Sequence, residues 1–127
     1  MENLLNKINQ LNQLVLQGRA MDAFEQYYDE QVSMQENALP PTVGKAANRQ
    51  RELEFYSNVS ELRTLHVLDV AAGDGVTMVV WQYDYTHKEW GVKNYTQVSV
   101  QHWRDDKIVR EQFFYDSVAA PQPELAA

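Results

Sequence analysis

The sequence predicts one α+β domain, with helices first and then a meander of long antiparallel strands. Three observations lead to this fold class. Apolar residues recur at helical spacing through the first third of the chain, whereas the remainder alternates apolar and polar residues, as strands do. Short turn signals separate the alternating runs. The 127 residues contain no repeat and no internal linker, so a single domain is the simplest interpretation.

Two helices are expected at the start of the chain. The first covers residues 2–18, and its apolar face carries Leu4, Ile8, Leu11 and Val15. Gly18 is placed to end this helix. The second covers residues 19–31 and repeats the spacing with Met21, Phe24 and Tyr28.

A short strand and a third helix follow. Residues 32–37 alternate, which places Val32, Met34 and Glu36 on one side, and two prolines then break the pattern. The third helix is expected over residues 45–59, with Ala46, Leu53 and Tyr56 on one stripe. Its solvated or rim side should carry Asn48, Arg49 and Arg51.

Two β-hairpins make up the rest of the pattern. The first joins residues 64–72 to residues 76–86 through a Gly-Asp-Gly turn. With Gly73 and Asp74 as the turn residues, His66 faces Trp81, and Tyr83 and Tyr85 lie on that same side. The second hairpin runs from residue 95 to residue 116 and turns at Asp105 and Asp106.

A two-residue turn in the second hairpin sorts its side chains onto two faces, because successive residues of a strand point to opposite sides. One face then carries Val98, Val100, His102, Val109, Glu111, Phe113 and Tyr115. The other carries Gln97, Ser99, Gln101, Trp103, Ile108, Arg110, Gln112 and Phe114. The more apolar face thus holds a histidine and a glutamate. Ionisable side chains are uncommon on such a face, so they are expected to have a structural or chemical role.

The composition argues against several classes of function. A net charge of −7 disfavours a nucleic-acid or anionic-membrane surface, because phosphates need clustered lysine and arginine. There is no cysteine, and the three histidines lie in separate strands or loops, so no metal site is expected. No cationic segment followed by an apolar run opens the chain, which favours a cytoplasmic location. A phosphate-binding glycine loop and an activated-nucleophile motif are also missing.

Several strings resemble the SnoaL-like family of the nuclear-transport-factor-2-like superfamily. They are "AFEQYYDEQVSMQEN", "GKAANRQRELEFY", "WQYDYT" and "KIVREQFFYD". The resemblance assigns residues 1–116 to one SnoaL-like domain and leaves residues 117–127 as a Pro- and Ala-rich tail that is expected to be disordered. It implies a cystatin-like cone, in which a curved sheet wraps a long helix around a pocket, and it implies homodimers that pack through their outer sheet faces.

The resemblance also suggests an answer for the apolar face with ionisable groups, which would line the pocket. Glu111 is then the expected general acid or base, with His102 setting its charge. A small, largely apolar molecule is expected to contact Glu36, Tyr115, Trp81, Tyr83, Phe113, Met34 and Tyr28. The opposite face, with Trp103, Ile108 and Phe114 among polar residues, is expected to meet a second copy of the chain.

Two functions remain open at this point. One is a cofactor-independent isomerase, cyclase or hydrolase that uses general acid–base catalysis. The other is a non-catalytic ligand-binding or dimerisation module, in which Glu111 and His102 only satisfy each other.

Overall fold

Six strands form one strongly curved sheet in the computed structural model, which describes residues 3–116. The elements in chain order are α1 (Leu4–Leu16), α2 (Ala20–Tyr27), β1 (Tyr28–Glu36), β2 (Thr42–Val43), α3 (Lys45–Asn58), β3 (Val59–Ala72), β4 (Val76–His87), β5 (Gly91–Arg104) and β6 (Lys107–Phe114). The strand order is β2-β1-β6-β5-β4-β3. Only the β1–β6 pair is parallel among these strands, so the predicted α+β class and mostly antiparallel sheet are confirmed.

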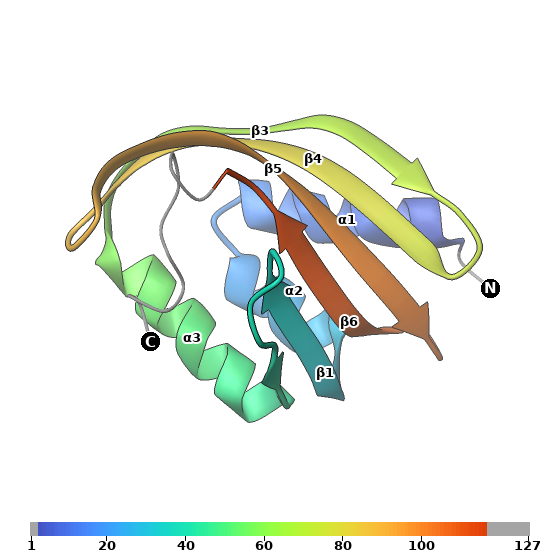
Figure 1. The fold of residues 1–127 in the computed structure, drawn as a ribbon. Coiled ribbons are helices and arrows are strands. Elements are labelled where there is room, and N and C mark those ends of the chain that lie inside the picture. Colours follow the sequence, from blue (N-terminus) through green and yellow to red (C-terminus); the bar gives the residue numbers. More distant parts are fainter. Residues whose placement is uncertain (1–2, 117–127) are drawn as a thin grey trace.

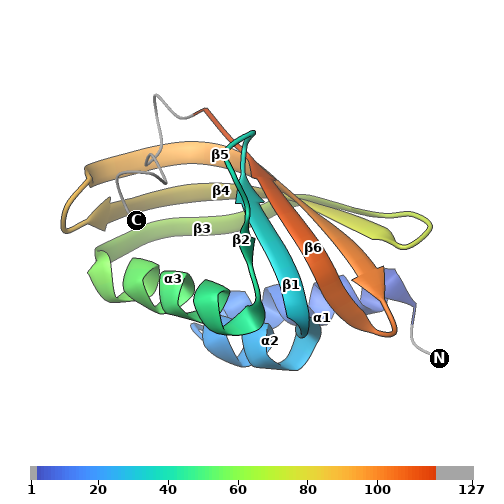
Figure 2. The ribbon, with the colours of Figure 1, turned by 60° about the horizontal axis from the view of Figure 1, so that its bottom comes forward.

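The helices lie on the concave side of the sheet. The long strands β3, β4 and β5 arch over α1, which contacts β3 and β4 (Figure 1). Figure 2 shows α3 below the other end of these strands, where it contacts β1, β2 and β3. The space between the sheet and the helices is therefore bounded by α1, α3 and the concave strand faces. The prediction for residues 117–127 lies outside the described residues.

The first helix begins and ends within two residues of its predicted bounds. The second begins as predicted, but it ends at Tyr27 and not at residue 31, because β1 already begins at Tyr28. Asn3 caps α1, because its Oδ1 accepts a hydrogen bond of 2.9 Å from the backbone nitrogen of Asn6. Gly18 follows the helix with φ of +78°, a conformation that glycine adopts without strain. The core between helices and sheet includes Ile8, Phe24, Val32, Val79 and Ile108.

The β5–β6 hairpin departs from the predicted register at one residue. The turn is as predicted, since Arg104 pairs with Lys107 and Trp103 pairs with Ile108. The next pair is His102 with Arg110, so Val109 is an extra residue without a partner. This β-bulge moves every later pair by one residue. Glu111 therefore lies opposite Gln101, not Val100.

The bulge inverts the predicted faces of β5. The residues Gln97, Ser99 and Gln101 are 8%, 2% and 2% exposed on the concave side. Their neighbours point the other way, so the prediction that His102, Val98 and Val100 face the pocket is wrong. Trp103 and Ile108, predicted on the outer face, pack in or against the core. On β6 the predicted inward side of Glu111 and Phe113 is correct.

The β3–β4 hairpin turns one position later than predicted and has a bulge of its own. Ala72 pairs with Thr77, and the Gly73 backbone nitrogen donates to the Val76 carbonyl oxygen over 2.8 Å, so Asp74 and Gly75 are the two turn residues in place of Gly73 and Asp74. Each partner in β4 thereby moves by two residues, which keeps the faces, and Trp81 and Tyr85 are buried on the core side of β4. A register shift between Val67 and Asp69 then places Val67 opposite Trp81. His66 is exposed, and the prediction that it faces Trp81 is wrong.

Asn48 holds the start of α3 against the strands. The sequence places it on the rim of the helix, but the structure buries it to 2% exposure. Its Nδ2 lies 3.3, 3.0 and 2.8 Å from the carbonyl oxygens of Val32, Thr42 and Gly44. One side chain thus joins β1, β2 and the turn before α3, which fixes the helix that closes the concave side.

We expect Asn48→Ala to lower the free energy of unfolding by about 1–3 kcal/mol, because buried carbonyl groups lose their donor. Chemical denaturation monitored by circular dichroism measures the change. The control is Asn9→Ala, at an exposed position of α1, which should shift stability by no more than about 0.5 kcal/mol. Equal effects of the two substitutions would contradict this role of Asn48.

The convex face of the sheet carries a continuous apolar patch. Met78 pairs with Val100, Val80 pairs with Val98, and Val98 pairs with Phe114. We call these five residues the convex patch. Met78 and Phe114 are 46% and 44% exposed, so large apolar side chains on this face are open to solvent. Because of the bulge, Val98 and Val100 of β5 lie on this face in place of the expected residues Gln97, Ser99 and Gln101.

We propose that two copies of the chain pack through the convex patch. Phe114→Lys should then convert a dimer to a monomer in sedimentation velocity at micromolar concentration, because the lysine would be buried without a partner. Val43→Lys, at a 64% exposed apolar residue of β2, should leave the dimer intact. A wild-type protein that sediments as a monomer would rule the proposal out.

Candidate functional site

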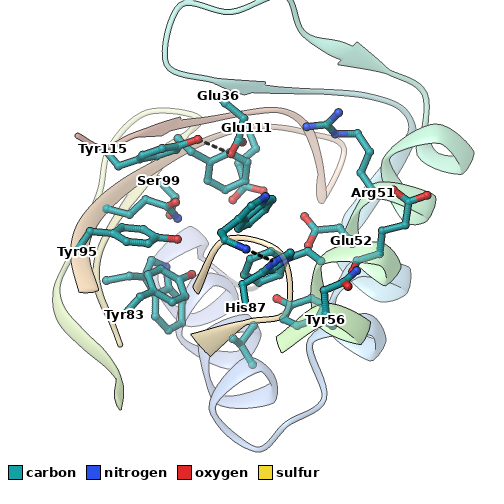
Figure 3. A pocket seen from close by; sticks show the side chains of 18 of the residues that line it. Glu36, Arg51, Glu52, Tyr56, Tyr83, His87, Tyr95, Ser99, Glu111 and Tyr115 are labelled. Atoms are coloured by element: carbon teal, nitrogen blue, oxygen red, sulfur yellow. Dashed lines mark hydrogen bonds between the residues drawn. The ribbon is translucent and has the colours of Figure 1, made fainter. Parts of the chain in front are cut away.

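A cavity of about 350 Å³ lies between the concave face of the sheet, α1 and α3. Figure 3 shows side chains converging on it from opposite sides. Its aromatic lining consists of Tyr28, Phe55, Tyr56, Trp81, Tyr83, Trp90, Tyr95, Phe113 and Tyr115. Its carboxylates are Glu36, Glu52, Glu54, Glu89 and Glu111. The cavity therefore combines aromatic walls with several acidic groups.

Glu111 is the most tightly held of these carboxylates. It is 4% exposed, and its two oxygens accept hydrogen bonds from different residues. The Tyr28 hydroxyl donates to Oε1, and Gln101 Nε2 donates to Oε2 over 2.7 Å. Burial raises the pKa of Glu111 to about 7, although both hydrogen bonds act in the opposite direction. Glu111 therefore changes its charge near neutral pH.

The orientation of the Gln101 amide is set by its other neighbours. Thr77 Oγ1 donates to Gln101 Oε1 over 2.7 Å, which leaves the amide nitrogen to face Glu111. Trp103 Nε1 in turn donates to Thr77 Oγ1 over 2.9 Å. The chain from Trp103 through Thr77 to Gln101 is buried or partly buried and ends on the Glu111 carboxylate. It holds the carboxylate at a defined place in the cavity wall.

Glu52 is a second carboxylate, and its environment is different. It lies on α3, and no hydrogen bond or ion pair reaches it from residues 3–116. Burial raises the pKa of Glu52 to about 8, the charges of Glu111 and Glu36 add to the rise, and Arg51 opposes it. At neutral pH Glu52 is mainly a protonated acid that faces the cavity.

Glu36 and Tyr115 form a third polar group at the end of β1 and β6. The Tyr115 hydroxyl donates to Glu36 Oε1 over 3.0 Å, as drawn in Figure 3. Burial raises the pKa of Glu36, while the hydrogen bond from Tyr115 and the charge of Arg51 lower it. The structure thus brings together two of the residues predicted for the pocket.

Stacked rings form the wall opposite α3. The Tyr83 and Tyr95 rings stack with centroids 5.4 Å apart, and the Tyr95 and Tyr115 centroids are 5.7 Å apart. The hydroxyls of Tyr85 and Tyr95 lie 3.0 Å from each other. Burial raises the pKa of both Tyr83 and Tyr95, so their hydroxyls stay neutral. The wall is aromatic and uncharged.

A histidine and a tryptophan stack at the mouth of the cavity. The rings of His87 and Trp90 are 3.6 Å apart at an interplanar angle of 7°. Backbone nitrogens of Glu89 and Trp90 donate to His87 Nδ1 over 3.1 and 3.3 Å. Burial lowers the pKa of His87, which agrees with a neutral ring that accepts at Nδ1.

The cavity also contains buried polar atoms that have no partner. Asn12 of α1 is 3% exposed, and neither its Nδ2 nor its Oδ1 has a hydrogen-bond partner within residues 3–116. The same holds for Trp90 Nε1. Both residues line the cavity. Unpaired buried polar groups are uncommon and costly, so these two indicate that something else completes them.

Most but not all of the residues predicted for the pocket lie there. Tyr28, Glu36, Trp81, Tyr83, Glu111, Phe113 and Tyr115 line the cavity. His102 does not, because the bulge turns it to the convex side, where it cannot set the charge of Glu111. Met34 is 7% exposed and belongs to the hydrophobic core below the cavity wall.

The contribution of α3 to the cavity was not predicted from the sequence. Glu52 and Tyr56 were assigned to no site, and Arg51 was placed on the rim, yet all three line the cavity. A signal was present, because Asn48, Glu52 and Tyr56 recur every four residues and so share one helix face. Tyr95 and Gln101 were missed for another reason, namely the inverted register of β5.

Residues 3–116 contain neither a metal-binding cluster nor a membrane-spanning helix. No group of three or more His, Asp or Glu side chains there is arranged to hold a metal ion. No helix in that part of the chain has the length and apolar character needed to cross a membrane.

Solved structures with the same fold are numerous. A candidate SnoaL-like polyketide cyclase from Mesorhizobium loti aligns over 90% of this chain and 100% of its own, with a TM-score of 0.80 and 21% identity. A SnoaL-like polyketide cyclase from Agrobacterium tumefaciens aligns over 94% and 95%, with a TM-score of 0.74 and 18% identity. An NTF2-like protein from Cytophaga hutchinsonii aligns over 93% and 94%, with a TM-score of 0.69 and 8% identity. At these identities the likeness shows the fold alone.

The family assignment comes from sequence. No curated protein matches the chain. The family model described as a SnoaL-like domain matches residues 8–111, which covers α3, nearly all of the sheet and the acidic cavity. The chain therefore belongs to the SnoaL-like domain family.

Proposed function

We propose that the protein binds a small organic molecule with a largely apolar body in this cavity and transfers a proton to or from it with Glu111 and Glu52. One observation carries the proposal: a buried carboxylate held by Tyr28 and Gln101 shares a cavity with a second carboxylate that has no hydrogen-bond partner within residues 3–116. The aromatic wall supplies the surface for the body of the ligand.

The two carboxylates suit different roles. The donors on Glu111 stabilise its ionised form, so it is the better base, and its pKa of about 7 keeps much of it ionised at neutral pH. Glu52, with a pKa of about 8, is mostly protonated and can donate to an oxygen that becomes negative. If Glu111 removes a proton from a carbon beside a carbonyl group and Glu52 gives a proton to the carbonyl oxygen, the product is an enol, which is an isomer of the ligand. If the carbanion instead forms a C–C bond to a second carbonyl carbon, Glu52 protonates the alkoxide oxygen, and the result is an aldol-type ring closure. Neither reaction needs a cofactor. Two similar structures named as polyketide cyclases support this class of chemistry.

Binding without chemistry is the second candidate. The observation that favours it is that Tyr28 and Gln101 already compensate Glu111, as a purely structural carboxylate would require. An assay of base catalysis that does not need the natural ligand distinguishes a catalyst from a protein that only binds.

The assay probe is 5-nitrobenzisoxazole, a flat neutral molecule. A base removes its C3 proton, the N–O bond breaks, and a coloured phenolate forms. We expect the protein to accelerate this reaction above the rate with free acetate. Glu111→Gln should lower the rate constant by about 100-fold, the lower end of the usual loss of a general base.

Glu61→Gln is the matched control, since Glu61 is an exposed β3 residue paired with Arg63 outside the cavity. It makes the same change of charge and should keep the full rate. A Glu111→Gln protein that remains folded and fully active would exclude Glu111 as the base. A wild-type protein that binds the probe without accelerating its decay would favour the binding module.

The pH dependence of the same reaction tests the role of Tyr28. The rate should rise as pH passes the pKa of Glu111, because only the carboxylate is a base. Tyr28→Phe removes a donor that lowers this pKa, so the midpoint should move upward by about one pH unit or more. Tyr27→Phe, on the neighbouring residue that bonds Gln10, should leave the midpoint unchanged. A midpoint that stays in place or falls in Tyr28→Phe would contradict the assignment.

A further inference from the structure

The charges around the cavity are unbalanced. Among residues 3–116, five glutamates and one cationic side chain, Arg51, line it, and the His87 ring is neutral by its hydrogen bonds. Arg51 forms no ion pair with Glu52 in this part of the chain, and the two charges interact only through space. An anionic ligand would therefore be repelled, and a ligand with positive charge would be attracted.

Glu52 is the carboxylate that most needs a partner. Glu111 has two donors and Glu36 has Tyr115, but Glu52 receives no hydrogen bond from residues 3–116. An ionised carboxylate in such a place costs several kcal/mol unless a cation or donors compensate it. A cationic group from a ligand would supply both the charge and the N–H or C–H contacts that the protein does not.

The aromatic side chains offer surfaces that also favour a cation. In Figure 3, Glu52 and Tyr56 lie on one side of the cavity and Tyr83 and Tyr95 on the other. A group placed between them meets a carboxylate and several electron-rich rings at once. Rings of this kind attract ammonium groups placed over their faces, and the attraction is stronger when water is excluded.

An independent observation shows that the cavity is built for a ligand with a polar group. Asn12 is only 3% exposed, and neither polar atom of its side chain has a hydrogen-bond partner within residues 3–116. A hydroxyl or carbonyl group on the ligand can donate to Oδ1 or accept from Nδ2. The unpaired donor Trp90 Nε1 offers a second contact of the same kind.

We propose that the ligand of this cavity is an organic cation, with a protonated or quaternary nitrogen against Glu52, an apolar body between the aromatic walls, and a hydroxyl or carbonyl group at Asn12. The proposal rests on the cavity of the proposed function and keeps Glu111 as its base. With the cation bound, Glu52 is ionised, so it is the counter-charge of the ligand and not the proton donor.

The groups that face Glu52 set how binding depends on pH. They are Glu111 of β6 and Glu36 of β1, which oppose its ionisation, Arg51 of α3, which favours it, and the neutral hydroxyls of Tyr28, Tyr56 and Tyr83. A cation binds the ionised form of Glu52, so it lowers the pKa of that carboxyl and releases a proton near neutral pH. Affinity for a permanent cation should therefore rise with pH toward 8.

The test compares two molecules of the same shape. (4-Hydroxyphenyl)trimethylammonium carries a permanent positive charge, and 4-tert-butylphenol replaces its nitrogen with carbon. Isothermal titration calorimetry at pH 7, in buffers with different enthalpies of ionisation, measures both affinity and proton release. We expect the cation to bind about tenfold more tightly or better and to release a proton, while the phenol should release none.

Glu52→Gln should remove most of this preference and the proton release, while affinity for 4-tert-butylphenol should change little. Glu61→Gln again controls for net charge and should keep the preference. Equal or tighter binding of the neutral molecule by the wild-type protein would overturn the proposal, as would failure of the cation to bind at millimolar concentration. These comparisons in the wild-type protein hold even if the variant does not fold.

The outcome is separate from that of the proposed function, because 5-nitrobenzisoxazole is neutral. Base catalysis that depends on Glu111, together with no preference for the cation, would leave the proposed function standing and refute this inference alone.

Discussion

The β-bulge at Val109 is the constraint on which the rest of the site depends. Ile108 is fully buried in the core and Glu111 lies in the cavity wall, and the two are three residues apart. A regular strand would place them on opposite faces, so the extra residue is what allows both to point inward. The same bulge brings Gln101 opposite Glu111, where its amide donates to the carboxylate. Without this pairing a buried carboxylate would lose one of its two donors and the cost of its ionisation would increase.

The tight turn before the bulge is held from both sides. Asp105 and Asp106 have φ of 50° and 67°, the positive values of a type I′ turn, which matches the twist of the flanking strands. Lys7 of α1 pairs with Asp106 and so ties the turn to the first helix. Trp103 then packs against Tyr27 and reaches Thr77 through its indole nitrogen. Because the turn and Ile108 are both fixed, the extra residue of the bulge is Val109. The direction in which Glu111 points therefore depends on the contacts of Asp106 and Trp103, which lie outside the cavity wall.

The sequence was a good guide to elements and a poor guide to faces. The bounds of α1 and α3 and the Asp105-Asp106 turn depend on local preferences, which the chain displays directly, whereas the end of α2 was predicted four residues too late. Which β5 side chains face the cavity depends on one unpaired residue in β6, Val109. A prediction that assumes strict alternation along both strands cannot include such a residue. The one visible trace was the adjacent apolar pair Ile108-Val109, which breaks the alternation at the bulge. Glu111 was found because its own strand was assigned correctly beyond that point. Glu52 was missed because a polar stripe on a helix resembles a solvated face until a curved sheet is seen to cover it.

The placement of charge in the cavity follows from which groups can ionise there. Burial raises the pKa of Tyr28, Tyr56, Tyr83 and Tyr95, so these hydroxyls remain neutral donors or acceptors. Changes of charge near neutral pH therefore fall to Glu52 and Glu111, because burial raises the pKa of both carboxyl groups and the charge of Glu111 opposes the ionisation of Glu52. Tyr28 and Gln101 favour the charge on Glu111, and Glu52 is left to hold the proton. Within residues 3–116, hydrogen-bond donors thus reach Glu111 and not Glu52, so the two carboxyl groups of one cavity differ in how readily they ionise.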